Sequence, residues 1–172
     1  GVVGLGLIGG SMARAYSINH PGVKMYHKDI KDFSFMDLER DLNIKKGDID
    51  LVVGGPPCQA YSTVGKRLAD DPRAKLFQEY FRILSEVKPK MFVYENVKGL
   101  LSMQGGNLIK QIKSLFESIG YHIQMQLLNA ADYGAPQIRE RIILVGTLDG
   151  YVFNYPKPTH YDPSAYPNPK KG

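Results

Sequence analysis

The 172-residue sequence has one cysteine and no tryptophan, and it lacks a long apolar run. A single cysteine cannot form an internal disulfide, so nothing in the sequence indicates an oxidising compartment. No apolar run approaches the roughly 18 residues that a membrane-spanning helix needs, and the N-terminus lacks the charged-then-apolar pattern of a signal peptide. We therefore expect a cytoplasmic protein with no membrane partner.

Acidic residues are fewer than basic ones, 17 Asp and Glu against 22 Lys and Arg, which gives a formal net charge of +5. This balance favours a polyanionic partner such as nucleic acid, although mildly basic proteins without such a partner are also common. Hydrophobic residues make up 43% of the chain and charged residues 23%, as in ordinary globular proteins. The length is sufficient for one domain with its own core.

Apolar, β-rich segments alternate with amphipathic helical segments along the chain. Strands are expected at residues 1–5, 23–30, 48–55, 91–95, 122–128 and 141–147, and helices at 9–18, 35–42, 73–87 and from an Asn107 cap to Gly120. This order predicts an α/β fold with a doubly wound, mostly parallel sheet and late antiparallel strands. Residues 1–154 are expected to form the core, and the proline-rich residues 155–172 a tail without regular structure.

Open α/β sheets bind ligands beyond the carboxyl ends of their parallel strands. Three loops are expected at that rim: GLGLIGG at residues 4–10, GGPPCQAYS at 54–62 and ENVKGLL at 95–101. Cys58 and Glu95 each follow the end of a strand, so they can share one cleft.

Cys58 lies in a loop that the sequence makes stiff. The two glycines of residues 54–57 let the backbone turn and approach a ligand, and the two prolines fix φ at their positions. A lone cysteine is more often a small buried hydrophobe. A rigid loop at the ligand rim, with polar Gln59 and Ser62 nearby, instead favours a thiol nucleophile held in a fixed geometry.

Polar residues also follow or begin two later strands. Glu95 ends an apolar strand, where burial would raise its pKa and let it donate a proton near neutral pH, unless helix N-terminal amides satisfy the carboxylate. Asn96 can hold the adjoining loop by side-chain to backbone hydrogen bonds. Gln137, Arg139 and Arg141 alternate in QIRER, so the strand start presents two guanidiniums for phosphate or carbonyl oxygens, or a solvated charged end.

The segments GGPPCQAYS, ENV and QIRER, in this order, resemble the signatures of the DNA (cytosine-5) methyltransferase family over roughly residues 19–160. The resemblance implies the fold of the S-adenosylmethionine-dependent methyltransferases. It also implies methyl transfer from S-adenosylmethionine to C5 of a cytosine flipped out of double-stranded DNA. A bacterial-type, nucleoid-associated enzyme of restriction–modification is then expected.

By the same resemblance, Cys58 adds to C6 of the cytosine and Glu95 protonates or hydrogen-bonds N3. Arg141 contacts the base carbonyl and Arg139 a backbone phosphate. The residues expected to support the flipped nucleotide and its phosphates are Gln59, Ser62, Asn96 and Gln137. Those expected to bind the cofactor are Gly4, Gly6, Asp29, Ile30, Pro57 and Leu76. No metal site is expected.

The N-terminal segment, residues 1–18, departs from the family pattern. Val2 stands where the family has an aromatic residue, and the glycine turn resembles that of nicotinamide-dependent dehydrogenases. Only 12 residues separate Gly6 from Asn19, too few for a helix, a strand and a second helix. The acid that binds the cofactor ribose is therefore expected to be missing, because a segment is absent or because a foreign glycine turn replaces the front.

Three functions follow from these patterns. The leading hypothesis is the catalytic core of a DNA cytosine-5 methyltransferase, either as a fragment or as one chain of a split enzyme whose second chain supplies target recognition. The second is a non-catalytic DNA-binding or assembly subunit with the same fold. The third, which rests on GLGLIG alone, is a dinucleotide-binding oxidoreductase.

Overall fold

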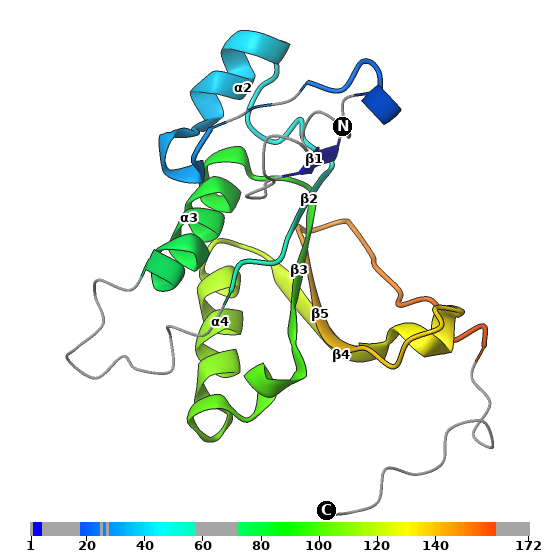
Figure 1. Cartoon of the computed structure of the whole chain (residues 1–172). Coiled ribbons are helices and arrows are strands. Elements are labelled where there is room, and N and C mark those ends of the chain that lie inside the picture. The colour runs from blue at the N-terminus through cyan, green and yellow to red at the C-terminus, as the bar shows by residue number, and fades with distance from the viewer. Residues whose placement is uncertain (1, 5–17, 25, 27, 58–71, 161–172) are drawn as a thin grey trace, which may run out of the picture.

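The structure is a computed structural model that describes residues 2–4, 18–24, 26, 28–57 and 72–160 (Figure 1). Its strands are β1 (Val2–Gly4), β2 (Leu51–Gly54), β3 (Met91–Val97), β4 (His122–Asn129) and β5 (Glu140–Thr147). Its α-helices are α2 (Phe35–Leu42), α3 (Pro72–Val87) and α4 (Asn107–Ser118). Short 3-10 helices are η1 (Ile30–Asp32), η3 (Lys98–Leu101), η4 (Met103–Gly106) and η5 (Ala130–Tyr133).

The strands form one mixed sheet in the order β1-β2-β3-β5-β4. β1, β2 and β3 run parallel to one another, and β5 is antiparallel to both β3 and β4. The reversal brings the start of β5 to the edge where the parallel strands end, because Arg141 pairs with Val97. The α/β fold with late antiparallel strands is therefore confirmed.

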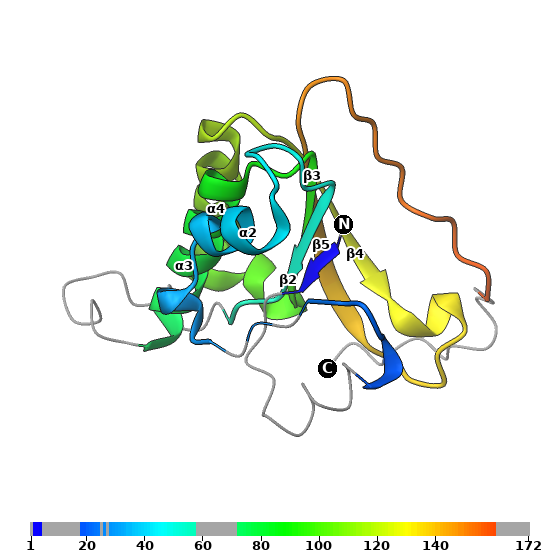
Figure 2. The same ribbon diagram turned by 90° about the horizontal axis from the view of Figure 1, so that it is seen from above.

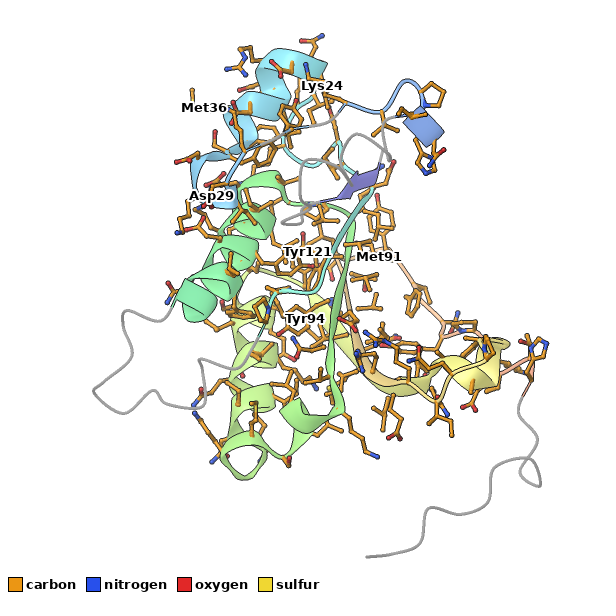
Figure 3. All side chains as sticks on the ribbon, in the orientation of Figure 1. Lys24, Asp29, Met36, Met91, Tyr94 and Tyr121 are labelled. Carbon is orange, nitrogen blue, oxygen red and sulfur yellow. The ribbon has the colours of Figure 1, made fainter. Side chains whose placement is uncertain are left out.

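The three α-helices gather on one face of the sheet (Figure 2). Phe92 and Tyr94 point from β3 toward them and are fully buried, as the two-residue alternation of a strand requires. Phe116 of α4 packs on this face, with its ring centroid 4.6 Å from that of Phe92. Figure 3 shows aromatic side chains, Tyr94 and Tyr121 among them, between the helices and the sheet.

Most of the expected elements are present where the structure describes them. The helix at 35–42 and the late strands are confirmed, while β2 is shorter than expected and β3 extends two residues further. Asn107 is the first residue of α4 rather than its cap, because the chain enters the helix through Gly106 in a left-handed conformation. Gly120 follows the helix end with a φ of 87°, as predicted.

The strand expected at residues 23–30 is wrong, since the described residues of this segment contain none. The side chain of Asp29 accepts a hydrogen bond from the Lys31 backbone N–H and caps η1. Such a local bond competes with strand pairing and turns the chain at this point. The helix expected at 9–18 falls largely on residues 9–17, which lie outside the described residues.

Residues 155–160 have neither helix nor strand, as their prolines predict. The Tyr155 hydroxyl donates to the carbonyl oxygen of Ile143 at 2.7 Å, and burial raises the pKa of this tyrosine to about 12. The backbone N–H groups of Thr159 and His160 both donate to the carbonyl oxygen of Asp132 in η5. The segment thus fixes the loop that leads into β5.

Candidate active site

Glu95 and Arg141 lie side by side at the rim of the sheet. Arg141 is diagonal to Glu95 on the same side of adjacent antiparallel strands, because it pairs with Val97 while Glu95 pairs with Ile143. The Nε atom of Arg141 is 2.7 Å from Oε1 of Glu95. This N–H makes no hydrogen bond of normal geometry within the described residues. The contact is therefore an ion pair in which the N–H is not aligned with the carboxylate.

The carboxylate of Glu95 is accessible. The side chain is 40% exposed, and that of its partner Arg141 is 24% exposed. The position of Glu95 at the end of an apolar strand therefore does not bury it. Phe92 and Tyr94 occupy the helix-facing side of β3, so Glu95 points to the other side, which the described helices do not cover.

The loop after β2 lies directly against this carboxylate. A Cβ atom at position 55 would lie 2.9 Å from Oε2 of Glu95 and 3.5 Å from its carbonyl oxygen, so Gly55 permits the contact. One residue earlier, a Cβ atom on Gly54 would lie 2.4 Å from Cε2 of Tyr80. Both glycines are needed because other parts of the chain approach the backbone closely at these positions.

Asn96 joins the same loop to β3. Its side chain is nearly buried, and Nδ2 donates to the carbonyl oxygen of Pro56 at 2.9 Å and to the Tyr94 hydroxyl at 3.1 Å. Oδ1 accepts a hydrogen bond from the Val97 backbone N–H. Asn96 therefore holds the loop from within the fold, as the sequence predicted for the adjoining loop.

Cys58, Gln59 and Ser62 lie outside the described residues. Pro57 is the last described residue of this loop; it is exposed and comes two residues after Gly55. The contact between Gly55 and Glu95 thus lies three residues before Cys58 in the sequence.

Gln137 and Arg139 precede β5 and are exposed. The expected alternation of Gln137, Arg139 and Arg141 on one side of a strand is wrong, because β5 begins only at Glu140 and the Gln137 N–H closes a tight turn onto the Ala135 carbonyl. The backbone N–H of Arg139 donates to Oδ1 of Asn129 at 3.0 Å, which fixes its main chain while its side chain remains exposed.

The sequence reading did not single out Lys98 and Glu140, which form an ion pair across the same edge with Nζ 2.8 Å from Oε2. Lys98 directly follows ENV, and Glu140 lies inside QIRER. Their positions next to and inside two motifs of the site could have identified them from the sequence. The carbonyl oxygen of Glu140 also accepts a hydrogen bond from the guanidinium of Arg141.

The residues expected to bind a cofactor lie on different elements. Gly4 ends β1, and Gly6 lies outside the described residues. Asp29 caps η1 through one carboxylate oxygen, and Ile30 is half-buried against the core. Leu76 of α3 is half-buried, and Pro57 is exposed. By chemistry, a carboxylate that accepts hydrogen bonds together with partly exposed apolar side chains fits the adenine of S-adenosylmethionine.

Among the described residues, no three His, Cys, Asp or Glu side chains are grouped so as to hold a metal ion. No helix in that part of the chain is both long and apolar enough to cross a membrane.

Residues 3–171 match the family model for C-5 cytosine-specific DNA methylases. The chain belongs to this family. The family membership confirms the resemblance carried by the three motifs, two of which supply the adjoining Glu95 and Arg141.

Relatives of this chain include the type II methyltransferase M1.HphI of Haemophilus parahaemolyticus, 40% identical over 84% of the chain, and M.XorII of Xanthomonas oryzae, 43% identical over 84%. The chain spans 39% and 35% of the lengths of these two relatives. Among solved structures, the Entamoeba histolytica methyltransferase EhMeth is similar with a TM-score of 0.61 and 26% identity, over 84% of this chain and 44% of that one. The fold is thus that of a methyltransferase.

Proposed function

We propose that this chain carries the catalytic core of a DNA cytosine-5 methyltransferase, which transfers a methyl group from S-adenosylmethionine to C5 of a cytosine flipped out of double-stranded DNA. One observation carries the proposal: segments far apart in the sequence meet at one rim of the sheet. Glu95 contacts both Gly55, in the loop that leads to Cys58, and Arg141 of the QIRER segment. This convergence is what a site acting on a single small ring requires.

In the proposed reaction, the thiolate of Cys58 attacks C6 of the base and forms an S–C6 bond. The electron pair of the C5–C6 double bond becomes available at C5, and Glu95 donates a proton or hydrogen bond at N3, which limits charge on the ring. S-adenosylmethionine would supply an electrophilic methyl group when bound: C5 uses its electron pair to form the C5–CH3 bond as the S–CH3 bond of the sulfonium breaks, and S-adenosylhomocysteine is the neutral thioether that leaves. Loss of the C5 proton to a base then re-forms the C5–C6 double bond, and the S–C6 bond breaks to release Cys58.

Arg141 has two functions in this proposal. Its ion pair at 2.7 Å holds the Glu95 carboxylate in place, and its guanidinium retains further N–H groups for the base carbonyl. Arg139 binds a backbone phosphate in this proposal, and Gln137 supports the flipped nucleotide; the exposure of both side chains supports these roles. Gln59 and Ser62 complete the support of the flipped nucleotide.

The proposed cofactor site uses Asp29 and Ile30 near the adenine, with Pro57 and Leu76 on the remaining sides. The half-buried Ile30 and Leu76 offer apolar surface, and the Asp29 carboxylate offers an acceptor for the exocyclic amine. Gly4 and Gly6 complete the set through the glycine turn after β1.

Double-stranded DNA is the proposed partner, in a bacterial, nucleoid-associated setting, with target recognition supplied by other residues or by a second chain. The relatives named above are type II methyltransferases, which agrees with a role in restriction–modification.

The test measures transfer of labelled methyl groups from S-adenosylmethionine to DNA by the full-length protein and its Cys58→Ser variant. We expect the variant to lose activity by at least about 10³-fold, because a hydroxyl is a far weaker nucleophile than a thiolate at neutral pH. DNA containing 5-fluorocytosine should trap the wild-type protein covalently, since C5 then has no proton to lose, and should not trap the variant. Unchanged methylation by Cys58→Ser would overturn the proposal, and salt-sensitive DNA binding without any methyl transfer would favour the non-catalytic subunit.

A further inference from the structure

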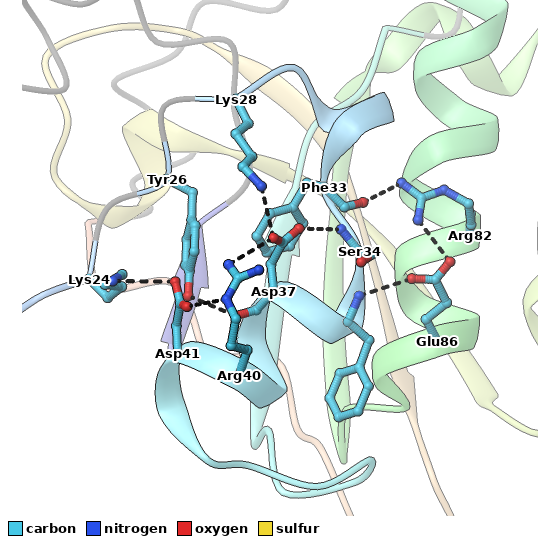
Figure 4. A network of polar contacts seen from close by, with 11 residues as sticks. Lys24, Tyr26, Lys28, Phe33, Ser34, Asp37, Arg40, Asp41, Arg82 and Glu86 are labelled. Atoms are coloured by element: carbon cyan, nitrogen blue, oxygen red, sulfur yellow. Dashed lines mark hydrogen bonds and ion pairs between the residues drawn. The ribbon is translucent and has the colours of Figure 1, made fainter.

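Arg82 of α3 reaches across to the segment that contains η1 (Figure 4). Its Nη2 atom donates to the carbonyl oxygen of Ile30 at 2.8 Å and to that of Phe33 at 2.7 Å. These acceptors are 52 and 49 residues away in the sequence, so the bonds join two distant parts of the chain. A single guanidinium nitrogen thus anchors both ends of η1 to α3.

The rest of the guanidinium is also fixed. Nε of Arg82 lies 2.6 Å from Glu79, and Nη1 lies 2.8 Å from Glu86 on the same helix. The second oxygen of Glu86 accepts a hydrogen bond from the backbone N–H of Phe35, the first residue of α2. Arg82 and Glu86 together therefore attach Ile30, Phe33 and Phe35 to one face of α3.

Asp37 of α2 binds residues on both sides of η1. Lys28 donates to Oδ1 of Asp37 at 2.8 Å, and the Ser34 backbone N–H donates to Oδ2 at 3.1 Å. The Asp29–Ile30 turn is consequently fixed at both flanks, by Asp37 of α2 and by Arg82 of α3. The close-up shows the contacts of Asp37 with Lys28 and Ser34 and that of Arg82 with Phe33 (Figure 4).

We infer that Arg82 is a positioning residue for the cofactor site, an inference that rests on the proposed function. The proposed adenine contacts, Asp29 and Ile30 on one side and Leu76 on the other, belong to two elements that Arg82 joins directly. A planar guanidinium satisfies two carbonyls and two carboxylates at once, whereas a lysine ammonium has a different shape and reach. Replacing Arg82 therefore changes the separation of the two walls of the site without removing any group that contacts the cofactor.

The test compares Arg82→Lys with the wild type by calorimetric titration of the full-length protein with S-adenosylmethionine, and by steady-state methyl transfer to DNA. Because a charged hydrogen bond to Phe33 is lost, we expect the Kd and KM for S-adenosylmethionine to rise about tenfold. The kcat at saturating cofactor and the KM for DNA are expected to stay within about twofold of the wild type. A general loss of structure would lower kcat and weaken DNA binding as well.

Glu79→Gln is the matched control, since it removes one partner of Arg82 on its own helix and leaves both carbonyl contacts. It should leave cofactor affinity within about twofold of the wild type. Glu86→Gln weakens the link to Phe35 and should also raise the Kd for S-adenosylmethionine, by less than Arg82→Lys does. If circular dichroism shows that Arg82→Lys does not fold, an unchanged Kd of Glu86→Gln overturns the inference in its place. Unchanged affinity in a folded Arg82→Lys variant would overturn the inference alone. Absence of S-adenosylmethionine binding by the wild type would overturn the inference together with the proposed cofactor site.

Discussion

Replacing Gly55 by alanine tests whether the position of Glu95 matters. The added Cβ would lie 2.9 Å from Oε2 of Glu95, whereas ordinary van der Waals contact at a Cβ begins at 3.4 Å. The carboxylate must therefore retreat by the difference, 3.4 − 2.9 = 0.5 Å. Gly55 has no positive φ that would itself resist the substitution. The perturbation thus acts on one functional group.

The consequence for activity follows from that displacement. A catalytic group misplaced by about 1 Å costs roughly 10²-fold in rate, so a shift of about half that size should lower kcat about tenfold. Stability should change by less than about 1 kcal/mol, because the displaced atom is the end of a partly exposed side chain. Any movement of Glu95 also disturbs its 2.7 Å ion pair with Arg141.

The assay is the initial rate of methyl transfer at saturating DNA and S-adenosylmethionine, together with thermal unfolding of each variant. Gly99→Ala is the matched control, since Gly99 lies in η3 just beyond Glu95 and a Cβ there would meet nothing within 4 Å. The control should match the wild type in both measurements. A kcat of Gly55→Ala within twofold of the wild type, in a protein of unchanged stability, would refute the role given to Glu95.

Two further substitutions test the supporting structure. Gly54→Ala should lower the free energy of unfolding by about 2 kcal/mol, because its Cβ would overlap the buried ring of Tyr80. A urea titration measures this, and unchanged stability would contradict the close packing of Gly54 on Tyr80. The hydrogen bond from Lys28, and after it the one from the Ser34 N–H, lowers the pKa of Asp37. The ionised Asp37 therefore stabilises the folded protein above about pH 4, and this stabilisation is lost as the pH falls through the lowered pKa. Asp37→Asn should therefore unfold at a lower temperature than the wild type at pH 7, with the difference shrinking in acid; a constant difference across the pH series would contradict the assignment.

Local sequence patterns and the rule for parallel strands were sufficient to predict several features of the fold and of the rim. The helix at 35–42 matches its expected bounds because its apolar spacing is reinforced by a capping box between Ser34 and Asp37. The parallel-strand rule predicted that Cys58 and Glu95 share one cleft; Cys58 lies outside the described residues, but Gly55 of the loop that leads to it does lie against Glu95. The helix bounds depend on the local sequence, and the meeting of strand ends follows from a general rule for parallel sheets, so both could be predicted.

Features that depend on tertiary contacts were not predictable. The strand β3 reads MFVYENV, with apolar residues on both sides, so alternation cannot say which side Glu95 takes. The packing of α3 and α4 against Phe92 and Tyr94 decides this, and it leaves Glu95 accessible. The expected strand at 23–30 failed for a similar reason, since the hydrogen bond accepted by Asp29 and the anchoring of η1 by Arg82 outweigh the propensity of the segment.

The reversed direction of β5 explains how its basic residues reach a site at the carboxyl ends of the parallel strands. Arg141 is the second residue of β5 and pairs with Val97, the last residue of β3. If β5 ran parallel to β3, its start would lie beside Met91 at the opposite end of β3, four residues or about 13 Å from Glu95 at roughly 3.3 Å per residue. The ion pair with Glu95 would then be impossible. The same reversal places Glu140 opposite Asn129 and within reach of Lys98, so the antiparallel strand brings charged groups to the rim that a parallel strand would place at the far edge.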